Sequence, residues 1–230
     1  MVRRGFLRKI LLVAALVLIR PNTLCFIFGT ATFLLGALLH LWTKGWLVRN
    51  DEVTTSGPYR FVRHPFYLAN ALLDAGICII AKSKWIFMIY PILFVIAYGR
   101  TIRREEEYLD ERHGEAWRAY RKRVPMIIPY RWPLPATPGT GFCWENLVRE
   151  GELPRFIRLL AYPLVLHLWA QLLKVEAHSW HATSLKPWLV FGQFGVLNVI
   201  EALAIIALFT AAAILRKRLR PPAPPESPKA

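Results

Sequence analysis

The sequence predicts an all-α, multi-pass integral membrane protein with about six transmembrane helices. Hydrophobic residues make up 55% of the 230-residue chain, yet it also carries 30 lysines and arginines and a net charge of +15. The apolar residues gather in runs close to the ~20 residues that a helix needs to cross a bilayer, and the basic residues lie between these runs. A nucleic-acid-binding domain would combine such charge with a soluble fold, so the pattern favours anionic membrane lipids as partners.

Six apolar runs underlie this prediction. They lie at 10–19, 24–42, 66–81, 85–99, 156–173 and 187–215. Arg158 and Pro163 interrupt the fifth run, so a buried or interfacial helix is its alternative interpretation. The second run carries Gly29 and Gly36 seven residues apart, and we expect a neighbouring helix to approach closely there.

Two of the runs contain an acidic residue, Asp74 in the third and Glu201 in the sixth. A charged side chain at membrane depth is costly unless it faces protein or a water-filled cavity. Asp74 is therefore either a polar group for a particular substrate or a partner for a neighbouring helix. The sequence gives Glu201 no role beyond its place inside the helix.

Most lysines and arginines fall on one side of the membrane if all six runs cross it. By the positive-inside rule that side is the cytosol, so both termini and the segments 44–63 and 100–158 are predicted to be cytosolic. The plasma membrane and the endoplasmic reticulum fit equally well. Arg3 and Arg4 resemble a twin-arginine export signal, but no small-residue cleavage site follows, which favours a short first span.

Residues 57–67, GPYRFVRHPFY, carry the densest chemistry in the chain. They combine a rigid Gly-Pro turn, two tyrosine hydroxyls, two arginines and a histidine with a proline suited to the first turn of a helix. This block resembles the G-x-Y-x-x-x-R-H-P-x-Y signature of the isoprenylcysteine carboxyl methyltransferase family and its relatives among the phospholipid methyltransferases.

A second block agrees with the first. It runs from EEEYL at 105–109 through GEAWRAY at 114–120 to RVP at 123–125, and is similar to that family's E-E-x-x-L, F-G-x-x-Y-x-x-Y and R-V-P string. His113 and Trp117 stand where the family usually has Phe and Tyr. Because both blocks keep the family's order and spacing, the resemblance is more specific than a lone R-H-P triplet.

The resemblance covers roughly residues 20–130 and divides the chain into three parts. We expect residues 1–135 to form a methyltransferase core with four spans and a cytosolic motif helix. Residues 136–220 are expected to form an extension with one or two further spans, and the Pro-rich tail at 221–230 is expected to be disordered.

The resemblance implies S-adenosyl-L-methionine as cofactor, although no glycine-rich loop after a strand is present to hold it. The site must then be assembled from helix ends. In such a site Arg63 would take the carboxylate of the cofactor, and His64 and Tyr59 would hydrogen-bond its polar edges. The remaining cofactor contacts are expected from Pro65, Tyr67, Glu105 and Glu106.

Methyl transfer is an in-line displacement, so the protein must chiefly align nucleophile and methyl group in a dry pocket. A carboxylate acceptor needs only a cation to position it, for which Arg104 is the candidate catalytic residue and Arg100 and Arg103 are alternatives. An amine acceptor needs a base, for which Glu106 or His64 is available. The three cysteines have no metal-type spacing, so no metal is expected.

The predicted function is methylation of a lipophilic acceptor that reaches the site from the bilayer. O-methylation of an isoprenylcysteine-like carboxylate is the first expectation, and N-methylation of a phospholipid or other lipid amine is the second. An NADPH-dependent membrane reductase of similar helical arrangement is a rival enzyme, and a non-catalytic membrane module is a rival of another class. The expected partners are lipid-modified or lipophilic small-molecule substrates and membrane lipids, without nucleic acid.

Overall fold

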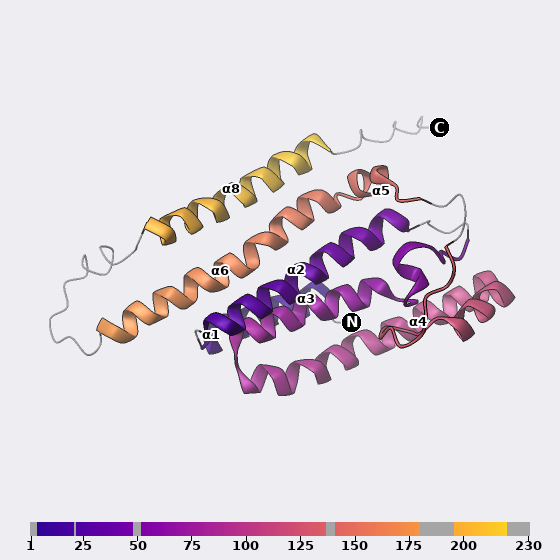
Figure 1. Ribbon diagram of the computed structural model, residues 1–230, viewed down its shortest axis with the longest axis horizontal. Helices are drawn as coiled ribbons and strands as arrows, with labels where there is room; N and C mark the ends of the chain where they lie inside the picture. Colours follow the sequence, from indigo (N-terminus) through magenta and orange to yellow (C-terminus); the bar gives the residue numbers. More distant parts are fainter. Residues whose placement is uncertain (1–3, 21, 48–51, 137–140, 180–195, 220–230) are drawn as a thin grey trace, which may run out of the picture.

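The computed structural model describes residues 4–20, 22–47, 52–136, 141–179 and 196–219, and every regular element in these ranges is a helix (Figure 1). The elements in chain order are α1 Arg4–Leu18, α2 Thr23–Trp46, the short 3₁₀ helix η1 Gly57–Arg60, α3 Pro65–Ala81, α4 Lys84–Arg123, α5 Trp144–Arg149, α6 Glu152–Ser179 and α8 Val196–Arg218. The prediction of an all-α protein is confirmed.

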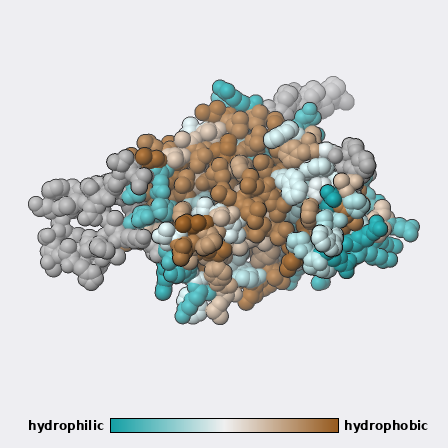
Figure 2. All heavy atoms as spheres, viewed as in Figure 1, coloured by the Kyte–Doolittle hydropathy of each residue, from teal (hydrophilic) through white to brown (hydrophobic). Residues whose placement is uncertain are grey.

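Three of the described helices are long and apolar enough to cross a membrane, namely α2, α4 and the segment Asn198–Arg218 of α8, and the apolar helix α3 is shorter. Figure 2 shows a broad hydrophobic band across the middle of the molecule with hydrophilic surface on either side of it. Large apolar side chains such as Phe28 and Val95 are exposed, as expected of a surface that faces lipid. The coarser prediction of a membrane protein is supported, while the number of six spans stays a prediction.

Helices α2 and α3 pack closely because glycines lie between them. A Cβ atom placed on Gly29 would lie 2.8 Å from the carbonyl oxygen of Gly76, and one placed on Gly36 would lie 2.6 Å from the backbone nitrogen of Leu73. A larger residue at either position would collide with backbone that cannot move aside. The close approach expected from the glycine spacing of the second apolar run is therefore present.

A buried polar cluster ties α1 to α3 and α4. The Nε atom of Arg8 donates to Oδ1 of Asp74 at 2.5 Å, and its Nη2 donates to Oδ1 of Asn70 at 2.9 Å. The hydroxyl of Tyr90 donates to the second oxygen of Asp74, whose side chain is fully buried. Two roles were open for Asp74, and in the structure it is a partner for the neighbouring helices α1 and α4.

Helix α4 includes both the apolar run 85–99 and the charged residues that follow it, and it extends along the long axis of the molecule (Figure 1). At Gly114 (φ 51°, ψ −118°) the backbone leaves helical geometry and changes direction. Glycine adopts positive φ without the steric cost of a Cβ atom. Beyond α4, residues 124–136 form no helix, in agreement with the prolines that predict an end to regular structure there.

The C-terminal helices pack against the core in sequence, with α6 beside α2 and α8 beside α6 (Figure 1). The predicted fifth run falls within α6, and the described part of the sixth falls within α8. Nδ1 of His167 lies 2.7 Å from Oε1 of Glu201, so the acidic residue of the sixth run joins α8 to α6. Residues 187–195 of that run and the tail at 221–230 lie outside the described residues.

Candidate functional site

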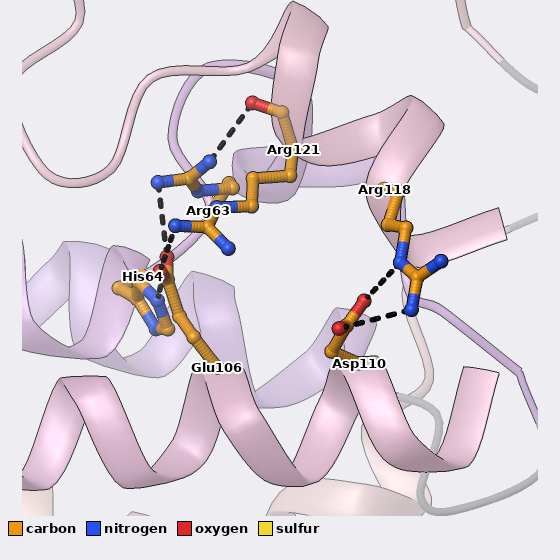
Figure 3. Close-up of polar contacts among 6 residues, drawn as sticks. All are labelled: Arg63, His64, Glu106, Asp110, Arg118 and Arg121. Carbon is orange, nitrogen blue, oxygen red and sulfur yellow. Dashed lines mark hydrogen bonds and ion pairs between the residues drawn. The ribbon is translucent and has the colours of Figure 1, made fainter. Parts of the chain in front are cut away.

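The two motif blocks meet in space. Nη2 of Arg63 lies 2.9 Å from Oε1 of Glu106, and Nε2 of His64 lies 3.2 Å from the same oxygen. A carboxylate can only accept, so the His64 ring donates to it from Nε2. The hydroxyl of Tyr67 donates to Oε2 of Glu105 at 2.7 Å. Figure 3 shows Glu106 extending from α4 toward the side chains of Arg63 and His64.

Backbone hydrogen bonds hold the first block against the end of the second. The amide of Arg63 donates to the carbonyl of Pro125 at 2.8 Å, and the amide of His64 donates to the carbonyl of Met126 at 3.0 Å. Pro65 then begins α3 at its first turn, where its missing amide hydrogen costs nothing. The RVP triplet therefore positions the backbone of the RHP triplet, and both side chains before Pro65 face the polar half of α4.

A cavity of about 320 Å³ lies on one side of this cluster. The first motif block, α1, α2, α3, α4 and the first turn of α6 all contribute to its wall. The lining residues are Arg8, His40, Lys44, Tyr59, Arg63, His64, Pro65, Phe66, Tyr67, Asn70, Tyr98, Glu105, Glu152 and Arg155.

A second cavity of about 340 Å³ is lined by the segment before η1 and by the polar half of α4. Its aromatic and apolar residues include Trp117, Tyr108 and Leu109. The two cavities share four lining residues, which are Tyr59, Arg63, His64 and Glu105. The motif residues thus form the partition between two chambers, one toward the membrane helices and one toward the charged end of the molecule.

Two buried donors in the wall of the second cavity have no hydrogen-bond partner among the described residues. The Nε atom of Arg63 and the indole Nε1 atom of Trp117 are both buried without a hydrogen bond. Such atoms are costly to leave unmet, and each borders a cavity in which a ligand could accept from it. Burial lowers the pKa of Arg63, although the charge of Glu106 opposes that shift, and a guanidinium remains protonated. Burial raises the pKa of Tyr59, so its hydroxyl keeps its proton.

The predicted site residues divide into two groups. Six of them line the first cavity together, namely Tyr59, Arg63, His64, Pro65, Tyr67 and Glu105. Glu106 lines neither of the two cavities. Its carboxylate instead contacts the side chains of Arg63 and His64 and positions them. Arg104 is exposed and also lines neither cavity. The roles of all eight residues stay predictions.

Several residues that line the first cavity lie outside the two motif blocks. From the sequence, Arg8 and Lys44 count only among the basic residues that set the topology, and His40 is expected to pack or to form an interfacial hydrogen bond rather than to contact a cofactor. Glu152 and Arg155 come from the first turn of α6, in the extension beyond the motifs. The side chain of Glu152 lies 3.5 Å from both His40 and Arg155. No local pattern marks these residues, because tertiary packing alone brings α6 to the cavity.

Comparison with known proteins agrees with the motifs. Residues 24–116 match the model of the phospholipid methyltransferase family. The resemblance stated from the two blocks is therefore confirmed. No solved structure matches the chain.

Several curated proteins are similar to part of the chain. Methanethiol S-methyltransferase of Crocosphaera subtropica is 32% identical over 31% of this chain and 27% of its own length. Protein-S-isoprenylcysteine O-methyltransferase of Schizosaccharomyces pombe is 29% identical over 35% of each chain. The cobalt-zinc-cadmium resistance protein CzcN of Cupriavidus metallidurans is 31% identical over 35% of this chain and 37% of its own length. The chain thus spans well under half the length of these relatives.

Proposed function

We propose that this protein is an S-adenosyl-L-methionine-dependent methyltransferase that acts on a lipophilic acceptor within the membrane. The family match and the two methyltransferase relatives support the methyltransferase class. The observation that carries the proposal is the partition between the two cavities, where the motif residues converge and where the second cavity is bordered by two buried donors that a ligand could satisfy.

The residues around the second cavity fit the cofactor. Arg63 offers a buried, unpartnered Nε atom suited to a carboxylate, and Trp117 offers a second donor beside an aromatic wall suited to a nucleoside. Glu105 borders both cavities and can accept from amino or hydroxyl groups. S-adenosyl-L-methionine would supply an electrophilic methyl group at the partition, with a neutral thioether as the leaving group.

The first cavity is where we place the acceptor. It reaches the membrane helices through α1, α2 and α3, so a lipophilic molecule could extend into it from the bilayer. In this cavity the protein would align the nucleophile of the acceptor with the methyl group and exclude water. The cations that border this cavity, Arg8, Lys44 and Arg155, are alternatives to Arg104 for positioning an anionic acceptor.

The geometry favours an acceptor that is already a nucleophile. Glu106 accepts from Arg63 and His64 on one oxygen and lies 3.5 Å from Arg121 on the other. A carboxylate engaged in this way is a poor base, because any proton it takes displaces these donors. We therefore place O-methylation of a carboxylate, such as that of an isoprenylcysteine-like group, ahead of N-methylation of a lipid amine, for which His64 would be the remaining base candidate. The comparisons give a nicotinamide-dependent reductase no support.

The proposal also includes the predicted topology. The basic residues of the site and of the polar half of α4 would lie on the cytosolic side, where the cofactor is available. Both termini would lie on that side of a multi-pass protein.

The test is binding of S-adenosyl-L-methionine to the detergent-purified chain, with NADPH as control ligand. Micromolar binding corresponds to about 8 kcal/mol, and loss of one charge-assisted contact costs roughly 1.5–3 kcal/mol, or tenfold and more in affinity. Arg63→Ala should show that loss. Arg118→Ala is the matched control, because Arg118 forms an exposed ion pair with Asp110 beside the site (Figure 3). Absence of binding, or equal binding by both variants, would contradict the proposal and leave the non-catalytic module.

A further inference from the structure

A third hollow lies outside the two cavities of the proposed site. It is a groove of about 590 Å³ between α3, α4 and the segment that follows α4. Its lining residues are Arg63, Leu68, Ala71, Phe94, Arg121, Lys122, Val124, Pro125, Met126, Ile127, Ile128, Tyr130 and Arg131. Four of these residues are basic and none is acidic, whereas acidic side chains line both cavities of the proposed site.

Among the described residues, the basic end of the groove has fewer acidic partners than basic groups. Arg63 and Arg121 share a single carboxylate, that of Glu106. Lys122 and Arg131 are exposed. Nη1 of Arg131 donates to the carbonyl of Lys122 at 2.6 Å, and this bond fixes the guanidinium without neutralising it. The groove therefore attracts an anion.

The rest of the groove is apolar and exposed. Leu68 and Phe94 form one wall on the apolar halves of α3 and α4. On the other wall, the side chains of Met126, Ile128 and Tyr130 are 43%, 71% and 69% exposed. Large apolar and aromatic residues next to Lys and Arg are typical of the boundary between the bilayer and water. A ligand that fills this groove must carry both an anionic group and apolar chains.

We propose that this groove binds an anionic phospholipid. The phosphate lies at Lys122 and Arg131, and the acyl chains lie along Leu68 and Phe94. The bound lipid is a ligand of the fold and not a methyl acceptor, so the proposal stands independently of the proposed function. It would nevertheless steady the site, because residues 125–126 of the groove hold the backbone of Arg63 and His64.

The experiment measures lipid retained by the full chain in detergent, by native mass spectrometry, with dioleoylphosphatidylglycerol and dioleoylphosphatidylcholine as probes. Phosphatidylglycerol carries no amine, so its binding cannot reflect methylation of a lipid amine. We expect it to bind at least tenfold more tightly than phosphatidylcholine. In Lys122→Gln/Arg131→Gln this preference should disappear, and in the conservative variant Lys122→Arg/Arg131→Lys it should persist.

The matched control is Arg118→Gln/Arg149→Gln, which removes the same charge from exposed positions that do not line the groove. It should keep the preference for phosphatidylglycerol. Equal retention of both lipids by the parent would overturn the proposal. So would an equal loss in the control, which indicates diffuse charge attraction, or displacement of the lipid by glycerol phosphate, which indicates a site for free phosphate. Thermal unfolding without added lipid verifies that each variant is folded.

Discussion

The hydroxyl of Tyr120 donates a hydrogen bond of 2.7 Å to the backbone carbonyl of Tyr59, and both groups are buried. This bond joins the final tyrosine of the second motif block to the tyrosine of the first. It fixes η1 against the C-terminal turns of α4, and thereby fixes the wall that the two cavities share. The residue pair is thus a structural link between the blocks, whatever ligand the cavities take.

Removal of this bond should weaken the protein and its ligand binding together. In Tyr120→Phe the carbonyl of Tyr59 loses its partner while the ring remains, and we expect a loss of about 0.5–1.5 kcal/mol in the free energy of unfolding. Binding of S-adenosyl-L-methionine should weaken as η1 loosens. Chemical unfolding and calorimetry measure the two effects. Tyr130→Phe, on an exposed side chain, should change neither, and equal stability of both variants would refute the link.

The role of Arg63 rests on the shape of its guanidinium as well as on its charge. Arg63→Lys keeps a cation that can pair with Glu106 but lacks the planar fork and its buried Nε donor. We expect a fold of nearly parental thermal stability with S-adenosyl-L-methionine affinity reduced at least tenfold. Arg118→Lys serves as control at the exposed pair with Asp110. Parental affinity in Arg63→Lys would mean that charge alone suffices.

Replacement by alanine should have opposite effects at Gly36, which packs against α3, and at Gly99, which lies on an open face of α4. Gly36→Ala places a methyl group 2.6 Å from the backbone nitrogen of Leu73 and 2.8 Å from the carbonyl oxygen of Ala69, so the helices must separate and stability must fall by about 1–3 kcal/mol. Gly99→Ala has no atom within 4 Å of the added methyl group. It should gain about 0.5–1 kcal/mol, because alanine favours a helix over glycine. Unfolding by SDS in mixed micelles measures both, and loss of stability in Gly99→Ala would contradict the argument.

Removing one partner of the ion pair between Arg8 and Asp74 should destabilise the protein more than removing both. Asp74→Ala leaves a guanidinium without its carboxylate in a buried place, and we expect a loss of about 3–5 kcal/mol. In Arg8→Leu/Asp74→Leu no charge remains to be compensated, and most of that stability should return. The same SDS titration measures both variants. A double variant as unstable as the single one would show that packing and not charge holds α1 in place.

The sequence predicted those features that depend on local chemistry. The glycines of α2, the proline that begins α3 and the prolines after α4 each act through their own backbone, and each has the predicted effect. The meeting of Arg63 with Glu106 followed from the family resemblance and not from any physical pattern, since the two residues lie 43 positions apart and the described residues contain no strand to align them.

The parts that escaped prediction depend on tertiary packing. Asp74 remained ambiguous because its partner Arg8 lies 66 residues away on a different helix. The change of direction at Gly114 depends on the backbone angles of this one residue. A glycine within a charged run does not by itself predict such a change. Glu152 and Arg155 reach the first cavity only because α6 packs beside α2.

That last arrangement has a consequence for how the chain is divided. The family resemblance ends before α6 begins, yet the first turn of α6 lines the cavity in which we place the acceptor. The proposed site therefore includes residues beyond the part of the chain that matches the family. Substitutions in the first turn of α6 would therefore change the wall of this cavity while residues 24–116, which carry the family match, stay the same.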